Sequence, residues 1–156
     1  MTGLFAAAFA ALYAGHQVGD LWVQTHAQAT AKGLPGWPGR LACARHVLAL
    51  TAAIGAAVAV MAAVTGAPVH ALPAVAGLAV NAASHYWADR RSTLAGLADW
   101  LGRTICPGKG AFYRLGSPRP GRDDNPTLGT GAYQLDQAWH IAWLFAAALI
   151  IAGGAS

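Results

Sequence analysis

Charged side chains are scarce in this chain of 156 residues, and glutamate is absent altogether. Only 10% of the residues are charged and 56% are hydrophobic, whereas soluble domains carry roughly 25% charged residues. This composition argues against a soluble globular protein and indicates contact with lipid. The two cysteines, Cys43 and Cys106, have no spacing that suggests a disulfide framework. Without glutamate, any carboxylate chemistry must come from aspartate.

Four apolar stretches are long enough to cross a hydrocarbon core of roughly 30 Å, which takes about 20 helical residues. We therefore expect an all-α fold, in which residues 1–156 form a single integral membrane domain built as a four-helix transmembrane bundle. The first stretch is expected to be retained rather than cleaved as a signal peptide, because no Lys or Arg precedes it and it contains His and Asp. The expected spans are residues 3–27, 41–65, 70–91 and 130–153.

The ten basic residues are confined to two regions of the chain, one at the connection between the first two spans and the span end beside it, and one at the connection between the last two spans and the span end beside it. The positive-inside rule then places both termini outside and both basic loops in the cytoplasm. The net charge of +4 therefore reflects topology and does not predict nucleic-acid binding. Membrane lipids are the expected partners, and a homo-oligomer remains open. The basic residues are Lys32, Arg40, Arg45, Arg90, Arg91, Arg103, Lys109, Arg114, Arg119 and Arg122.

The connections between the expected spans differ in their sequence patterns. Residues 33–39, "GLPGWPG", predict a compact turn, because Pro and Gly interrupt helices. Leucines recur at helical spacing over residues 93–105, which favours a short amphipathic helix on the inner surface, with a plain loop helix as the alternative. Residues 106–129 contain four prolines and five glycines and are expected to form a long cytoplasmic loop. Thr130 is the predicted N-cap of the last helix.

Three His/Asp pairs share a spacing of four residues, which puts both members of each pair on one helix face. Three aspartates turned toward lipid would cost on the order of 9 kcal/mol, so all three must face the bundle interior. Given the expected topology, each Asp lies nearer the cytoplasm and each His roughly 6 Å deeper. The pairs are His16 and Asp20, His85 and Asp89, and Asp136 and His140.

Three carboxylates in one apolar interior require a positive partner, and a divalent cation is the simplest one. His and Asp ligands suit zinc first, with manganese or iron as alternatives, and allow one ion or two. Gln24 and Asn81 extend two of the stripes and are expected beside the ligands. The alternative is a buried network in which Asp pairs with His⁺ or with Arg45, Arg90 or Arg91 and only fixes the packing. The expected ligands are His16, Asp20, His46, His85, Asp89, Asp136 and His140.

The function that this pattern favours is a metal-dependent hydrolase at the inner leaflet, acting on a phosphate-bearing or lipid substrate. One of Asp20, Asp89 and Asp136 would complete the coordination or accept a proton from metal-bound water. Arg114, Arg119 and Arg122 could bring a phosphate-bearing headgroup over the pocket. One alternative is a non-enzymatic membrane adaptor or assembly protein with a structural polar core. An ion- or proton-coupled transporter is disfavoured, because the outer halves of the spans offer almost no polar groups.

The segments "GHQVGDLWVQT", "ARHVLAL", "SHYWADRR" and "LDQAWHIAWLF" resemble the successive motifs of a small bacterial integral-membrane family, catalogued as domain of unknown function 3307. The resemblance covers nearly the whole chain, and "RPGRDDNPTLGTGAY" is similar to the actinobacterial branch. It implies a location in the bacterial cytoplasmic membrane and a pattern similar to that of membrane-bound metal-dependent hydrolases. It adds Gln137 to the motif residues named above.

Overall fold

The computed structural model describes residues 2–117 and 129–154, and all regular secondary structure in these ranges is helical. The all-α prediction is confirmed for this part of the chain. The helices are α1 (Thr2–Val18), the π-helical turn η1 (Gly19–Val23), α2 (His26–Ala31), α3 (Gly36–Thr65), α4 (Ala71–Asp89), α5 (Ser92–Thr104), α6 (Lys109–Tyr113) and α7 (Gly131–Gly153).

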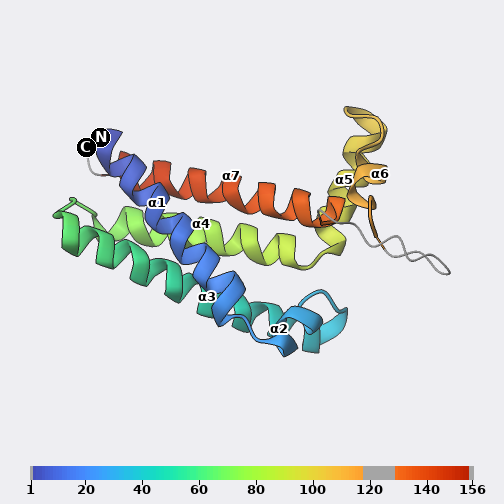
Figure 1. Ribbon diagram of the computed structural model, residues 1–156, viewed down its shortest axis with the longest axis horizontal. Helices are drawn as coiled ribbons and strands as arrows, with labels where there is room; N and C mark the ends of the chain where they lie inside the picture. Colours follow the sequence, from blue (N-terminus) through green and yellow to red (C-terminus); the bar gives the residue numbers. More distant parts are fainter. Residues whose placement is uncertain (1, 118–128, 155–156) are drawn as a thin grey trace.

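The four long helices, α1, α3, α4 and α7, lie side by side (Figure 1). Helices α1 and α4 each pack against both α3 and α7, which leaves α1 diagonally opposite α4. Helix α1 begins and α7 ends at the same end of the bundle, while α2, α5 and α6 lie at the other end (Figure 1). The basic residues of the connections that fall in the described ranges therefore gather at the end that carries the three short helices.

The inward stripe has an apolar half and a polar half on α1, α3 and α7. On α1, the fully buried Leu12 is followed one turn later by His16. On α7, His140 is followed one turn later by the fully buried Leu144. The apolar half of the interior consists of Ala8, Leu12, Leu50, Ile54, Val58, Leu144, Ala147, Ala148 and Ile151. Polar side chains fill the half nearer to α2 and α5.

Two glycines bring α1 against α3. A Cβ atom added at Gly15 would lie 2.7 Å from Ile54 Cα, and one added at Gly19 would lie 2.5 Å from Leu50 Cδ1. The contact at Gly15 is with backbone and requires glycine, whereas at Gly19 the Leu50 side chain would have to move and Leu50 Cα would lie 3.0 Å away. The spacing is the G-x-x-x-G pattern that lets helix backbones approach closely. The close approach carries the His16 face of α1 toward His46 on α3.

The first span was predicted to continue to residue 27, and this boundary is wrong. The helix loosens into η1, Gln24 becomes extended, and a new helix, α2, begins after Thr25. The cause is a capping box: Thr25 Oγ1 accepts a hydrogen bond from Gln28 N at 3.2 Å, and Thr25 N donates to Gln28 Oε1 at 2.9 Å. Asp20 consequently lies in the π-helical turn, an irregularity common at functional sites.

Other boundaries differ less. The compact turn predicted for residues 33–39 is shorter, because α3 already begins at Gly36 and accepts Pro38 in its first turn, where backbone N–H groups lack helical partners. The amphipathic helix predicted for residues 93–105 is present as α5. The loop predicted for residues 106–129 contains α6, and its residues 118–128 lie outside the described part. Thr130 caps α7, as predicted, by accepting a hydrogen bond from Tyr133 N at 3.1 Å.

Two helices, α3 and α7, are long and apolar enough to cross a membrane. Helix α1 has 17 residues, about 26 Å of helix at 1.5 Å per residue. Helix α4 is long enough, but Asn81, His85 and Asp89 make it less apolar. The described residues therefore contain two candidate membrane spans, α3 and α7, where the sequence predicts four.

Candidate metal centre

One histidine from each long helix joins a single buried layer. His16, His46, His85 and His140 are all at most 1% exposed. His85 is the central member: its ring centroid lies 3.9 Å from that of His140, 5.2 Å from that of His46 and 5.3 Å from that of His16. Four rings this close cannot all carry positive charge, because like charges at this distance repel strongly. At least one ring of the layer is therefore neutral, the form that binds metal.

The three aspartates form a second tier on the side of α2 and α5. Asp20, Asp89 and Asp136 all line a cavity at this end of the bundle, whereas none of the four buried histidines reaches its wall. The Asp side chains are 12%, 4% and 29% exposed, in that order. The structure thus brings together all seven residues expected as ligands, with the carboxylates toward the cavity and the imidazoles deeper.

Three potential ligand atoms lie around His46 Nε2. This atom lies 3.2 Å from His85 Nε2, 3.2 Å from Asp20 Oδ1 and 3.3 Å from Asp89 Oδ2, and His85 Nε2 lies 3.1 Å from Asp89 Oδ2. An imidazole N–H carries one proton and can serve one such acceptor well. The cluster therefore contains more hydrogen-bond acceptors than its N–H groups can satisfy.

Several buried polar atoms in the cluster have no hydrogen-bond partner among the described residues. Both ring nitrogens of His16 belong to this group, and so do Nε2 of His140, Oδ1 of Asp20 and Oδ2 of Asp89, whose ionisable neighbours at 3.1–3.4 Å lie outside hydrogen-bond geometry. An unsatisfied buried polar atom costs about 1–3 kcal/mol, and more when it is charged. Such a concentration is expected where the atoms have a partner other than protein, such as a metal ion or ordered water.

Three overlapping sets of side chains place ligand atoms within 4.8 Å of one another. Asp20, His46 and His85 form the first set, and His16, His85 and His140 form the second. Asp89, Asp136 and His140 form the third. His85 and His140 each belong to two sets, so neighbouring ions would have to share ligands.

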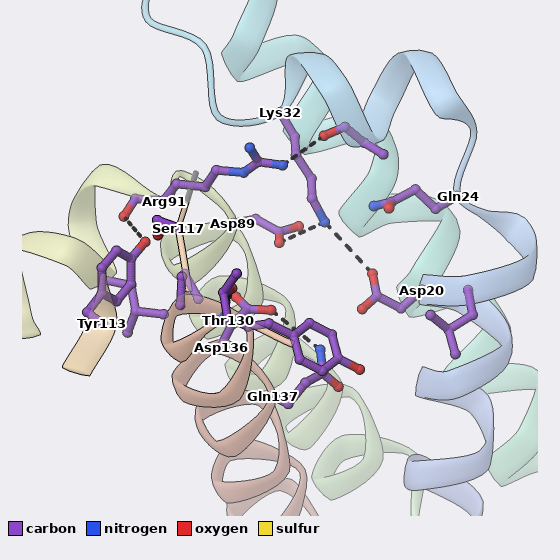
Figure 2. A pocket seen from close by; sticks show the side chains of 16 residues that line it. Asp20, Gln24, Lys32, Asp89, Arg91, Tyr113, Ser117, Thr130, Asp136 and Gln137 are labelled. Atoms are coloured by element: carbon purple, nitrogen blue, oxygen red, sulfur yellow. Dashed lines mark hydrogen bonds and ion pairs between the residues drawn. The ribbon is translucent and has the colours of Figure 1, made fainter. Parts of the chain in front are cut away.

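Lys32 lies against the carboxylates, a contact that the sequence reasoning missed. Its Nζ is 2.8 Å from Asp89 Oδ1 and 3.8 Å from Asp20 Oδ1, and the side chain is 11% exposed. Figure 2 shows the ammonium group between the two aspartates. Arg45, Arg90 and Arg91, the arginines expected to pair with Asp in the structural alternative, do not form these ion pairs. A cation from the protein itself therefore neutralises part of the acidic tier.

The two arginines after Asp89 hold α2 in place through its backbone carbonyls. Arg90 donates to Lys32 O and to Leu34 O, each at 2.5 Å, and Arg91 Nη2 donates to Ala29 O at 3.1 Å. Arginine near a helix C-terminus satisfies carbonyls that lack helical partners. Residues 89–91 thus clamp both the backbone of α2 and the ammonium group that follows it.

The residues expected beside the ligands have separate positions. Gln24 and Gln137 line the cavity, and Gln137 Nε2 donates to Asp136 Oδ2 at 3.4 Å. Asn81 is 1% exposed and lies one turn from His85 on α4. Its Nδ2 and the Nε2 of Gln24 have no hydrogen-bond partner among the described residues. Their position agrees with the expectation, but only Gln137 contacts a member of the cluster through a hydrogen bond.

The arginines proposed to hold a headgroup are not found over the cluster. Arg114 forms a bidentate ion pair with Asp99, with Nη1–Oδ1 and Nη2–Oδ2 distances of 2.7 and 2.6 Å, and does not line the cavity. Its guanidinium holds the pKa of the Asp99 carboxyl below the usual value. Arg119 and Arg122 lie outside the described residues. The arginine that does line the cavity is Arg91.

The cavity has a volume of about 540 Å³ and lies between η1, α2, the end of α4 and the start of α7 (Figure 2). Besides the three aspartates, its wall contains Lys32, Arg91, amide side chains and hydroxyl groups. Tyr113 Oη donates to Arg91 O at 3.4 Å, and burial raises the pKa of this phenol, so it stays protonated at neutral pH. The volume lies within the range of about 300–1,000 Å³ typical of small-molecule sites.

No family model, curated protein or solved structure matches this chain. The resemblance drawn from the four motifs therefore stays a prediction, and the argument for function rests on the geometry of the cluster.

Proposed function

We propose that this protein resides in a membrane, binds a divalent metal ion in its His/Asp cluster and uses the ion for hydrolysis at the membrane surface. The observation that carries the proposal is the convergence of Asp20, His46, His85 and Asp89. Ligand atoms around a tetrahedral zinc ion are about 3.3–3.6 Å apart, because the bonds are about 2.0–2.2 Å long. Four of the six distances among these ligand atoms are 3.1–3.3 Å, close to this spacing, and Asp20, His46 and His85 place their ligand atoms within 4.8 Å of one another.

An apolar exterior around a partly polar interior supports residence in a membrane. Only 22% of the most apolar stretch of α3 and 33% of that of α7 are buried, whereas a core helix of a soluble protein would be mostly buried. Large apolar side chains such as Leu48, Val60 and Leu149 face outward. Histidines and aspartates occupy the interior instead. In water this arrangement would be unfavourable, but in lipid it is the expected one.

Our proposed topology has four spans, both termini outside and the cavity open to the cytoplasm. Helix α1 with η1 and helix α4 would complete the bundle, since they pack between α3 and α7 along its length. The end with the cavity also carries the exposed Trp22 and Trp37, and tryptophan is enriched at membrane interfaces. If the resemblance of the motifs holds, this membrane is the bacterial cytoplasmic membrane.

Hydrolysis requires an activated water molecule and a group that takes its proton. A bound divalent ion would supply a water of lowered pKa. Asp136 is the best base among the three aspartates, because it is the most exposed of them, lines the cavity and lies outside the Lys32 contacts. His140 Nε2, 3.4 Å from Asp136 Oδ1, positions that carboxylate together with Gln137.

The test is the metal content of protein purified in detergent from metal-supplemented cells. We expect about one or more equivalents of a transition metal, zinc first, and a loss of most of it in His85→Ala. His26→Ala is the matched control, because His26 is exposed and lies outside the cluster. A metal-free wild-type protein, or equal metal content in His85→Ala and His26→Ala, would contradict metal binding by the cluster.

A second test separates binding from catalysis. Asp136→Asn should retain metal but lose hydrolysis of p-nitrophenyl phosphate by about 10²-fold or more, the usual contribution of a general base. Asp99→Asn is the control, since Asp99 pairs with Arg114 away from the cavity. Unchanged hydrolysis in Asp136→Asn would remove this residue from the mechanism.

A non-enzymatic adaptor with a structural polar core is the second candidate function. The observation that favours it is Lys32, whose ammonium already supplies positive charge to Asp20 and Asp89. A charge network of this kind can hold helices together without any metal. Absence of metal after metal-replete preparation would support this role over the hydrolase.

A further inference from the structure

The cavity over the His/Asp cluster is lined by side chains of both charges. Asp20, Asp89 and Asp136 line it together with two cationic side chains, Lys32, whose ammonium group lies between Asp20 and Asp89, and Arg91 (Figure 2). Metal ions bind carboxylates, whereas ammonium and guanidinium groups bind anions. The two cationic side chains therefore suit an anion, whereas the carboxylates suit a metal ion.

The backbone at Arg91 indicates that its position is not incidental. Arg91 has φ = +56°, and it is the only non-glycine residue with positive φ in the described part of the chain. A bulky residue in this region is strained by about 1–3 kcal/mol, and such strain clusters at ligand sites. The strained turn keeps the guanidinium at the cavity wall, where its hydrogen bond to Ala29 O uses Nη2.

Two helix N-termini add positive potential at the same place. Arg91 is the N-cap residue of α5, and Thr130 is the N-cap residue of α7. Arg91 and Thr130 both line the cavity, together with Leu94 and Tyr133 from the first turns of these helices. Helix N-termini favour anions, phosphate groups in particular. The Nε2 of Gln24 is a further buried donor without a hydrogen-bond partner in the described residues.

We propose that this cavity binds a phosphate-class anion, a phosphomonoester or diphosphate group, between Lys32, Arg91 and the N-termini of α5 and α7. This inference rests on the proposed hydrolase, for which it names the substrate class. Metal and anion should bind cooperatively. A metal ion that takes up the carboxylates of Asp20 and Asp89 releases the Lys32 ammonium group from them, and the freed charge is then available to the anion.

The source of the phosphate group is either a soluble molecule or a lipid headgroup. The cavity of about 540 Å³ is much larger than a single phosphate, and Leu21, Ala29 and Leu94 give its wall an apolar part. Leu21 and the neighbouring Trp22 are 65% and 86% exposed at the edge of the bundle. Both sources share the same anion chemistry, so the experiment has one arm for each.

The test uses the full chain in maltoside micelles, which contain no phosphate. The probes are inorganic phosphate for the soluble arm, and mixed micelles with phosphatidic acid or phosphatidylcholine for the lipid arm, each with and without Zn²⁺. We expect saturable phosphate-group binding that tightens with Zn²⁺. Binding of phosphatidic acid alone identifies a lipid headgroup, and binding of both identifies a site open to soluble ligands. Failure of both inorganic phosphate and phosphatidic acid to bind would overturn the proposal.

Variants then locate the site. Arg91→Gln should weaken binding by about tenfold or more, the loss expected for one charge-assisted hydrogen bond, whereas Arg91→Lys should retain most of it. Arg103→Gln is the matched control, because it removes the same charge from an exposed position on α5 outside the cavity. Equal weakening by Arg91→Gln and Arg103→Gln would overturn the site.

The outcome is separable from that of the proposed function. A protein that holds metal but binds neither probe retains the metal site and loses the phosphate site. A metal-free protein that binds phosphate through Arg91 retains the anion site and loses the metal-dependent hydrolase.

Discussion

Lys32 compensates the charges of Asp20 and Asp89 when no metal is bound. Its ammonium lies 2.8 Å from Asp89 Oδ1, and the side chain is mostly buried. Buried carboxylates that lose their positive partner are destabilising by about 3–5 kcal/mol, because the remaining charge is desolvated without compensation. The same ammonium group repels a divalent cation. Lys32 therefore stabilises the metal-free protein and opposes metal binding.

Replacing Lys32 by Met should separate these two effects. With a chelator present, Lys32→Met should lower the free energy of unfolding by about 3 kcal/mol. With Zn²⁺ present, the variant should bind metal at least as tightly as wild type and recover most of the lost stability, because the ion replaces the ammonium group. Thermal unfolding of the detergent-solubilised protein measures both.

Lys109→Met is the control for this substitution, since Lys109 lies on α6 and its Nζ sits 5.0 Å from the Phe112 ring centroid. A Lys32→Met variant that is as stable as wild type in chelator would show that the ion pairs contribute nothing.

At the scale of single elements, glycine contacts and short helices determine how the cluster is presented. Gly15 and Gly19 let α1 approach α3, and the capping box at Thr25 turns the chain back over the carboxylates. Helix α6 packs on α5 through the ion pair of Asp99 and Arg114. Arg114 Nη1 also donates to Gly110 O at 2.8 Å, so one guanidinium both caps α6 and attaches it.

Substituting Gly15 by Leu should disrupt the α1–α3 contact. The first added atom alone would lie 2.7 Å from Ile54 Cα and 3.2 Å from Ala53 O, so the helices must separate. Overpacking of this kind costs about 1–3 kcal/mol. We expect a lower unfolding temperature together with reduced metal content, because His16 and His46 move apart. Gly3→Leu is the control, since no atom lies within 4 Å of a Cβ at that position. Equal metal content in both variants would speak against a coupling of packing and site.

The attachment of α6 should depend on pH in a defined direction. Arg114 lowers the pKa of Asp99 from its ordinary value of 3.8, so the carboxylate stays charged in the folded protein when it would begin to protonate in the unfolded chain. Its contribution is therefore fully present above about pH 5 and is lost as the pH falls through the lowered folded pKa. The unfolding temperatures of wild type and Asp99→Asn should differ at pH 7 and converge below pH 4. A constant difference across this range would exclude the ion pair as its cause.

On the scale of the whole molecule, the directions in which the helices run determine at which end of the bundle the site lies. Helix α1 begins and α7 ends at one end of the bundle, and the cavity lies near the other end (Figure 1). In the topology that we propose, this arrangement would place the cavity and the described basic residues of the connections on the same side of the membrane. The site would then take its ligands from that side.

The natural thiols allow a test of this topology. Cys106 is exposed at the end of α5, whereas Cys43 is buried. In sealed right-side-out cells, a membrane-impermeant maleimide should fail to label Cys106 and should label a cysteine introduced by His70→Cys, at the exposed turn between α3 and α4. Permeabilised cells should show labelling at both. Labelling of Cys106 in intact cells would reverse or exclude the proposed orientation.

The predictable features are those that depend on neighbours in the chain. The four-residue spacing of His85 and Asp89 places both on one helix face wherever the helix lies, and the high energy of an aspartate in lipid turns that face inward. The N-cap at Thr130 and the helix α5 follow from residues within a few positions. For the same reason, the boundary at Thr25 was within reach, because Thr25 and Gln28 have the spacing of a capping box.

Contacts between distant segments came only with the tertiary structure. Lys32 and Asp89 are 57 positions apart, and their ion pair depends on α2 folding back over the end of α4. The sequence distinguishes apolar from polar helix faces, but it does not state which of ten basic side chains reaches the interior. Membership of the His/Asp cluster was thus determined by local periodicity, whereas the cation beside it, the arginine at the cavity wall and the cavity itself were decided by how the helices pack.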